Sequence, residues 1–359
     1  MKKIISIFLI LFISIGCKAV SEELIPFLYM NRYGYVNNEM SIKISPKFAR
    51  AENFSSNGFA IVTFDTMNHG IINLEGETII SVNRGQIFHI DRSLYNISDF
   101  DKNEHYIINL DDNCIISKYE AYDKSNNGYI LVVYPNEKNR YGFIDYNGNR
   151  VLSGLILKRS SYSFSNKRAR ITNEDWDPQI IDIDGNIVGN ILFTDLGQRY
   201  SEGLISARTS DGLTGYVNES GSFAFFSNFV SNNTIPEATE FSNGYAAIKA
   251  SEKPSIWKII NNKGQIVADN ILVDKMEKFS SGISLVSKID PVNKEVRYGY
   301  INTNGEYLVK TILEQADNFH NGYARIKLNG REGLFKNNAK VIWSSDIMEN
   351  CIIDNELKL

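Results

Sequence analysis

The side chains that most often carry out chemistry are few in this chain, and they are scattered along it. Its four histidines are His69, His89, His105 and His320. No two of them have the spacing at which neighbouring residues bind one metal ion. We therefore interpret them as ordinary sequence variation, and the sequence predicts no metal site and no cofactor.

One acidic segment, residues 182–186 (Asp-Ile-Asp-Gly-Asn), resembles a calcium-binding loop in composition. An EF-hand loop places its glycine two residues after the second acidic ligand and needs a distal glutamate. Here Gly185 follows Asp184 directly, at a place where a tight hairpin turn needs glycine. We interpret the segment as a turn, and Asp111–Asn113 as a similar turn in which the glycine is replaced.

Motifs for covalent or phosphate chemistry are missing from the sequence. It contains no Gly-rich phosphate loop, no Gly-x-Ser-x-Gly, no Cys-x-x-Cys and no His-Glu-x-x-His. Carboxylates from distant parts of the chain could still meet in the fold and hydrolyse a glycosidic bond. We expect a protein that is not an enzyme, and we keep a carboxylate-based glycan hydrolase as the less favoured alternative.

A local cluster of basic residues stands out in a chain whose formal net charge is −4. Its members are Lys158, Arg159, Lys167, Arg168 and Arg170. One interpretation is a docking point for an anionic glycan, a lipid headgroup or a protein partner. The other is a solvated face that is neutralised by the acidic residues Glu174, Asp175 and Asp177. The acidic net charge excludes the basic footprint of a nucleic-acid-binding protein, so we expect no nucleic-acid partner.

The chain begins like an exported protein. Lys2 and Lys3 precede an uncharged, mainly apolar segment, 4–15, that has the length of a signal peptide and is too short to span a membrane comfortably. Residues 14–17 resemble the lipobox of bacterial lipoproteins, with Gly16 and Cys17 matching and Ser14 in place of the usual leucine. The resemblance implies cleavage before Cys17 and anchoring to a membrane by acyl chains on that cysteine. The alternative is an ordinary secretory leader cut after Ala19.

The other two cysteines, Cys114 and Cys351, lie 237 residues apart in the sequence. A disulfide needs two close and well-oriented Cβ atoms, which this separation does not favour. We therefore expect two free, buried thiols.

The rest of the chain is organised by an internal repeat. The hairpin at 141–152 (YGFIDYNGNRVL) recurs, and its Gly142 position marks each copy. The corresponding residues are Gly34, Gly70, Tyr106, Gln179, Gly215, Lys258, Gly299 and Gly333. The first five intervals are 36 or 37 residues, which indicates a repeat array in which each unit packs on its neighbours.

Each unit also carries a second phrase, Phe-Ser-x-x-Gly-aromatic-Ala, seen in full at 54–60. Close copies lie at 241–246, 279–283 and 319–324, and weaker ones at 164–169 and 200–204. We expect its glycine to adopt positive φ at a tight turn, and we expect a half-buried strand after it. Asn147-Gly148 and its counterparts predict hairpins with a type I turn and a glycine bulge.

Together these features predict three or four short antiparallel strands per unit and no helix. The array is expected to loosen between Gly85 and His105, where we predict a longer loop. We also expect the aromatic residue before each marker glycine to lie over the neighbouring strand, because glycine has no side chain to hold it off.

The phrase, the turn and the strand order resemble the WG-repeat family, also called KWG repeats, over essentially the whole chain after the leader. The tryptophan of the family name is replaced by Tyr33, Tyr141 and Tyr298, whereas Trp257 is kept but precedes Lys258. The resemblance implies a repeat scaffold found in many bacterial proteins, and it implies no shared enzymatic site.

The predicted fold is all-β, with tandem units that form a propeller-like incomplete ring or an open β superhelix. The nine markers slightly favour an open arrangement, because propellers typically have four to eight blades. The predicted divisions are a signal peptide at 1–16, a lipidated cysteine and tether at 17–25, the repeat array at 26–346 and a C-terminal cap at 347–359.

The predicted function is that of a non-enzymatic lipoprotein of the bacterial cell envelope. We expect acyl chains to attach it to the outer membrane or the cell surface rather than to the inner membrane. Its repeat surface would bind an unknown envelope protein or a glycan through variable loops. A structural assembly factor for the envelope is the second hypothesis.

Overall fold

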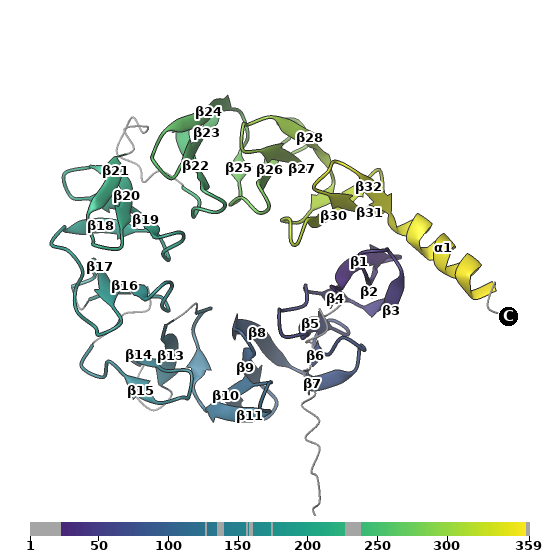
Figure 1. Cartoon of the computed structure of the whole chain (residues 1–359), viewed down its shortest axis with the longest axis horizontal. Helices are drawn as coiled ribbons and strands as arrows, with labels where there is room; N and C mark the ends of the chain where they lie inside the picture. The colour runs from purple at the N-terminus through teal and green to yellow at the C-terminus, as the bar shows by residue number, and fades with distance from the viewer. Residues whose placement is uncertain are drawn as a thin grey trace, which may run out of the picture.

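The protein is a ring of small antiparallel sheets (Figure 1). The computed structural model describes residues 23–125, 128–134, 140–155, 157, 161–173, 175–226 and 238–356. Within these residues there are nine sheets, which we number 1 to 9 in chain order. In Figure 1 the first strand of a sheet lies toward the centre of the ring and the last lies at its rim, as β8 and β11 show. This radial arrangement is that of a β-propeller.

The strands follow the chain in order within every sheet. Sheet 1 contains β1 (Ile25–Tyr29), β2 (Arg32–Val36) and β3 (Ile42–Phe48); sheet 2 contains β4 (Arg50–Ala51), β5 (Ala60–Thr63), β6 (His69–Ile72) and β7 (Thr78–Val82). Sheet 3 contains β8 (Gly85–Asp91), β9 (Leu94–Asp99), β10 (Glu104–Asn109) and β11 (Cys114–Ser117); sheet 4 contains β12 (Glu120–Ala121), β13 (Ile130–Tyr134), β14 (Arg140–Ile144) and β15 (Arg150–Val151). Sheet 5 contains β16 (Arg168–Thr172) and β17 (Pro178–Asp182); sheet 6 contains β18 (Phe193–Leu196), β19 (Leu204–Thr209), β20 (Thr214–Asn218) and β21 (Phe223–Phe226). Sheet 7 contains β22 (Tyr245–Glu252), β23 (Ser255–Asn261) and β24 (Ile266–Ile271); sheet 8 contains β25 (Lys275–Met276), β26 (Ile283–Ile289), β27 (Val296–Asn302) and β28 (Tyr307–Leu313). Sheet 9 contains β29 (Gln315–Ala316), β30 (Tyr323–Leu328), β31 (Arg331–Lys336) and β32 (Val341–Trp343).

Each repeat marker lies in a different sheet, which confirms the repeat. The marker falls on the third strand of every four-stranded sheet, as Gly142 does on β14 and Gly299 does on β27. Gly142 pairs with Val132, and Gly299 pairs with Val286. The all-β, repeated architecture predicted from the sequence is therefore present.

The marker glycine is needed because the rim strand approaches it closely. A Cβ atom at Gly299 would lie 2.6 Å from the carbonyl oxygen of Val309, where β27 and β28 have a bulge in their register. The aromatic residue before the glycine packs against its neighbours, as Tyr141 does on Tyr122, but it is not the most buried ring. The fully buried ring follows the glycine, as Tyr300 does, whereas Tyr298 before the glycine is only half-buried.

Those buried rings join each sheet to the next. The Tyr300 ring packs edge-on against Phe319 with centroids 5.1 Å apart, and its hydroxyl donates a hydrogen bond to the Asp317 carbonyl at 2.7 Å. The Tyr216 ring packs in the same way on Phe241, at 4.8 Å. Each phrase phenylalanine therefore belongs to the core between two sheets.

Both predicted turns are confirmed. In the phrase turn, Asn243 and Gly244 have φ angles of 55° and 81°, and two positive values in succession are typical of a type I′ turn. Lys167 stands where other copies have glycine, and it adopts a φ of 62°. In the hairpin turn, Gly148 has a φ of 84° and its amide donates a hydrogen bond to the Asp145 carbonyl.

The segment from Gly85 to His105 is more regular than expected. It contains β8, β9 and the start of β10, all paired in sheet 3, and not a longer loop. The polar residues of β9 concealed this, because they are buried and hydrogen-bonded. Asn96, for example, is buried, and its Oδ1 accepts a hydrogen bond from the Ala121 amide at 2.8 Å.

The ring closes, which corrects the expectation of an incomplete ring or an open superhelix. Sheet 9 packs against sheet 1, and we call this joint the seam. Its core contains Ile25, Phe27, Val36, Tyr323, Leu334 and Ile347. The guanidinium of Arg325 crosses the seam, where it donates a hydrogen bond to the Ala51 carbonyl at 2.8 Å and lies 4.9 Å from the centre of the Tyr33 ring.

A single helix among the described residues, α1 (Ser344–Glu356), follows the last sheet, although no helix was expected. Ile347 is buried in the seam core and Met348 packs against it, and from there the helix extends outward from the ring (Figure 1). Asp346 in its first turn favours a helix, because negative charge interacts well with a helix N-terminus. No described helix has the length and apolar character needed to cross a membrane.

Candidate binding site at the ring seam

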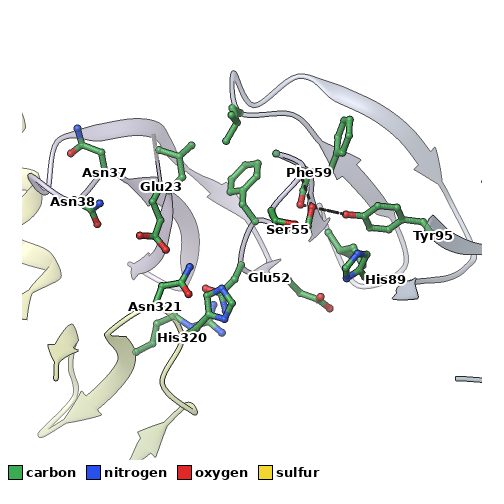
Figure 2. A pocket seen from close by; sticks show the side chains of 18 of the residues that line it. Glu23, Asn37, Asn38, Glu52, Ser55, Phe59, His89, Tyr95, His320 and Asn321 are labelled. Atoms are coloured by element: carbon green, nitrogen blue, oxygen red, sulfur yellow. Dashed lines mark hydrogen bonds between the residues drawn. The ribbon is translucent and has the colours of Figure 1, made fainter. Parts of the chain in front are cut away.

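A pocket of about 1030 Å³ opens where the seam meets sheets 2 and 3, and we call it the seam pocket. Figure 2 shows its wall, with Glu23, His320 and Asn321 on one side and Ser55, His89 and Tyr95 on the other. The residues therefore come from both ends of the array. The pocket exists only because the ring closes.

Charged side chains of both signs line the seam pocket. Glu23, Glu39 and Glu52 supply carboxylates, whereas Lys124 and Arg325 supply positive charges. Phe54, Phe59 and Leu74 add apolar surface to the wall. Such a lining can hold a partner that offers hydrogen-bonding groups beside apolar ones.

On the sheet 3 side, Tyr95 and His89 hold each other in place. The Tyr95 hydroxyl donates a hydrogen bond to Ser55 Oγ at 3.2 Å, and burial raises the pKa of Tyr95 to about 12. Tyr95 is therefore protonated at neutral pH. The His89 ring packs 4.9 Å from the Tyr95 ring, and its Nε2 donates a hydrogen bond to the Arg92 carbonyl at 2.6 Å.

On the sheet 9 side, His320 and Arg325 have different roles. Burial lowers the pKa of His320 below its usual value, and the Glu23 carboxylate partly opposes this change. The imidazole is therefore mainly neutral at pH 7, so it can both donate and accept a hydrogen bond. Arg325 pairs with Asp317 and with the Ala51 carbonyl, so it fixes the wall of the pocket.

Two smaller pockets lie beside the seam pocket. One, of about 720 Å³, shares Glu52, Ile61 and Arg325 with it. The other, of about 210 Å³, lies between β1 and sheet 9 and shares Glu23 and His320. The three pockets at the seam thus adjoin one another.

The basic cluster predicted from the sequence lies elsewhere, on sheet 5. Arg168 donates a hydrogen bond from Nε to the Glu219 carbonyl at 3.0 Å, and Arg170 lies 3.7 Å from the Asp195 carboxylate. Both arginines thus also link sheet 5 to sheet 6. Lys158 and Arg159 lie outside the described residues, and the predicted docking point remains a prediction.

Several other residues singled out from the sequence have defined places. Asp182 Oδ1 accepts hydrogen bonds from the amides of Asp184 and Asn186, at 3.0 and 2.9 Å, which confirms the turn. These hydrogen bonds, that of Asn186 first, lower the pKa of Asp182. Cys114 is free but exposed, so the expectation that it would be buried was wrong. Cys17 lies outside the described residues.

Metal-binding side chains do not gather in the part of the chain that the structure describes. No three side chains of His, Cys, Asp or Glu come together there in a way that could hold a metal ion.

Sequence reasoning did not find the seam pocket, although a signal for it existed. Glu23 lies four residues before Phe27, which pairs with the marker Gly34. In sheets 2, 8 and 9 the residue four positions before the partner of the marker is Gly58, Gly282 or Gly322. Glu23 therefore occupies a repeat position that is glycine in those sheets. His320 likewise stands where Ser242 and Ser280 stand. Departures from the repeat therefore meet in this pocket.

Comparison with known families identifies the repeat. The model of the WG-containing repeat family matches residues 33–65 and 298–331, which lie on the two sides of the seam. The chain carries WG repeats at these two places. A search of curated protein sequences finds no significant match.

Solved structures resemble this ring at low sequence identity. A eukaryotic initiation factor aligns with a TM-score of 0.61 and 10% identity, covering 90% of this chain and 95% of that chain. BamB from Moraxella catarrhalis aligns with a TM-score of 0.38 and 10% identity, covering 75% and 94%. The C-terminal WD40 domain of Sif2 gives 0.42 and 9%, covering 88% and 92%. The similarity to the initiation factor shows the propeller fold of this chain and nothing about its function.

Proposed function

We propose that this WG-repeat protein is a non-enzymatic binding protein of the bacterial cell envelope that holds a protein or glycan partner in the seam pocket. The observation that supports this is the clustering of repeat-breaking residues there. A repeat position is filled by the residue that its turn or packing needs. A departure such as Glu23 or His320 has no such explanation, and both line one pocket.

The turn itself does not call for the side chains found at positions 23 and 320. The phrase glycines adopt positive φ, as Gly322 does at 81°, and other residues take that conformation less readily. Glycine or serine at 23 and 320 would fit the pattern of the other sheets. Charged and titratable side chains at these two positions therefore serve something other than the turn.

The binding proposal can be tested with variants that restore the repeat. A photo-crosslinking amino acid placed at Asn38, which lines the seam pocket, should capture a partner in intact cells. The same probe at Asn304, in the exposed sheet 8 turn, serves as the control position. The double variant Glu23→Gly/His320→Ser should keep the fold and reduce capture at least tenfold. Undiminished capture would contradict the proposal.

A matched variant separates the two candidate surfaces. Lys167→Gly also restores a phrase glycine, but it lies in the basic cluster of sheet 5. Capture at the seam should be unchanged by Lys167→Gly. If this variant alone abolished capture, the partner would bind at the basic cluster instead. Turnover of a glycan by the purified protein would replace the binding proposal by the hydrolase alternative.

The location in the envelope rests on the lipobox-like leader and is likewise a proposal. Two or more acyl chains on Cys17 would anchor the ring stably, where one would not. Cys17→Ala should abolish labelling with radioactive palmitate and release the protein from the membrane fraction. Membrane association that survives this substitution would refute the lipid anchor.

A further inference from the structure

The hairpin turns on one face of the ring carry exposed apolar side chains. Strands follow the chain in order and alternate in direction within every sheet, so the turn just before each marker strand lies on the same face of the ring. We call these turns the tips. In sheets 1, 2, 3, 5, 6 and 8 the tip carries a large apolar residue, respectively Met30, Met67, Phe100, Trp176, Leu213 and Val292. These six side chains are between 44% and 89% exposed.

Two further described tips differ, and the opposite face is built from other residues. The tips of sheets 7 and 9 contain Pro254 and Gly330, and that of sheet 4 lies outside the described residues. Turns on the opposite face combine polar residues with glycine, as at 147–148, 243–244 and 304–305 (Asn-Gly in each). Because turns favour such small polar residues and glycine, the turns alone do not explain the large apolar residues of the tips.

The seam pocket opens on the face opposite the tips. Ser55 and Asn321, which line it, belong to phrase turns, and Asn38 belongs to the turn after the first marker strand. The apolar tips are therefore a surface separate from the candidate binding site.

Two of the tips show how the backbone beside the apolar residue is satisfied. Asp65 Oδ1 accepts a hydrogen bond from the Met67 amide at 3.0 Å, and Asp290 Oδ1 accepts one from the Val292 amide at 2.8 Å. A segment that enters a lipid surface must satisfy its backbone polar groups within the protein. The amides of Met67 and Val292 meet this requirement.

The arrangement of the tips favours a lipid surface as the occupant. The sheets are spread around the ring, so their tips lie apart from one another and do not form one groove (Figure 1). A protein partner usually binds a contiguous apolar patch, whereas a fluid bilayer accepts separate side chains wherever they enter. Trp176 also suits a bilayer, because tryptophan is enriched at membrane interfaces.

The charges beside the tips indicate which headgroups such a surface would carry. Asp65 and Asp290 lie in the tips, and Arg32, Lys102 and Lys294 lie in or directly after them. Clusters of positive charge alone attract anionic lipids. A mixture of both signs does not, so it fits zwitterionic headgroups.

We propose that the ring lies flat on a lipid bilayer of mainly zwitterionic headgroups, with its tips at the headgroup boundary. The seam pocket then faces away from the membrane, where a partner can reach it. Separate side chains hold a bilayer only weakly, so the tips orient a ring that another attachment keeps at the membrane. The inference rests on the proposed location at a membrane, and it is independent of what binds in the seam pocket.

The length of the chain before the ring is compatible with this orientation. Five residues separate Cys17 from Glu23, the first described residue. Such a segment can span at most about 20 Å, which is also about the length of a six-residue strand. An acylated Cys17 would therefore keep the tips within reach of the bilayer.

Site-specific fluorescence quenching tests the orientation in the full chain. The background replaces Cys17, Cys114 and Cys351 by serine. A hexahistidine tag added at the C-terminus binds nickel-chelating lipid in phosphatidylcholine vesicles, so every variant is held at the membrane whether or not the lipid anchor exists. Failure of the anchor proposal is thereby separated from failure of this one.

A fluorophore is attached to Met67→Cys or Val292→Cys at the tips, or to Asn147→Cys or Asn304→Cys on the opposite face. Nitroxide-labelled lipid should quench the two tip positions at least threefold more than the two opposite positions. High salt should leave this difference unchanged, because the contact is apolar. Equal quenching on both faces, or stronger quenching at Asn304→Cys, would overturn the proposal.

A pair of double variants checks that the apolar side chains cause the orientation. Phe100→Ser with Leu213→Ser removes two tip residues and should at least halve the quenching at Met67→Cys. The matched control, Ile79→Ser with Ile266→Ser, removes two similarly exposed residues of the rim strands β7 and β24 and should leave it unchanged. Equal effects of the two double variants would also overturn the proposal.

Discussion

At the scale of single residues, the sheets are held together by tyrosines that are both buried and hydrogen-bonded. Tyr300 fills the core between sheets 8 and 9, and its hydroxyl satisfies the Asp317 carbonyl. Burial raises the pKa of Tyr300 well above its usual value, so the hydroxyl keeps its proton at neutral pH. The ring supplies apolar contact, and the hydroxyl removes the cost of a buried carbonyl.

Tyr300→Phe separates these two contributions. It keeps the ring and leaves the Asp317 carbonyl without this donor, so the free energy of unfolding should fall by about 1–2 kcal/mol. Urea denaturation measures the change. The control Tyr307→Phe, at an exposed position on the rim, should change stability by less than about 0.5 kcal/mol. Equal effects at both positions would refute this role of the hydroxyl.

His320 makes stability depend on pH in a defined direction. Its pKa in the folded ring lies below the usual 6.5, so the unfolded chain binds the proton first as pH falls. The stability that neutral His320 contributes is complete above about pH 6.5 and is lost below it. His320→Ser should therefore lose less stability than the wild type between pH 7.5 and 5.5, as measured by urea midpoints. Asn321→Ser is the control and should behave as the wild type.

At the scale of the element, the marker glycine allows the rim strand to cross the strand before it. Gly299→Ala would place a methyl group 2.6 Å from the Val309 carbonyl oxygen, and backbone atoms cannot move away cheaply. We expect it to destabilise the protein by about 1–3 kcal/mol. Gly154→Ala is the control, because a Cβ there meets nothing within 4 Å. Thermal unfolding of the two variants side by side checks the difference, and equal melting temperatures would contradict it.

The repeat, its turns and its strands could be predicted from the sequence because they depend on contacts within one unit. Gly148 and Gly244 mark positive φ locally, and the alternation after them marks strands. The regular strand β9 was missed because its buried polar residues, such as Asn96, look like those of a loop. Helix α1 was missed because the seam, rather than a long periodic pattern, buries its Ile347.

At the scale of the whole molecule, closure could not be predicted, because it depends on residues about 300 positions apart. The contact of Arg325 with Ala51 is an example, and nothing in either local sequence marks it. The seam pocket depends on the same closure, so it could not be predicted from the sequence either. The sequence did show the residues that differ from the other copies at the same repeat position, among them Glu23 and His320.

Because the first and last sheets already touch, the starting point of the chain is arbitrary for the packing of the ring. A circular permutant could join residue 356 to residue 23 by a flexible linker and open between Val292 and Asn293, a loop tip where Val292 is 89% exposed. We expect this permutant to fold and to give the same small-angle X-ray scattering profile as the parent protein. A permutant that stays unfolded would show that assembly must begin at the natural first sheet.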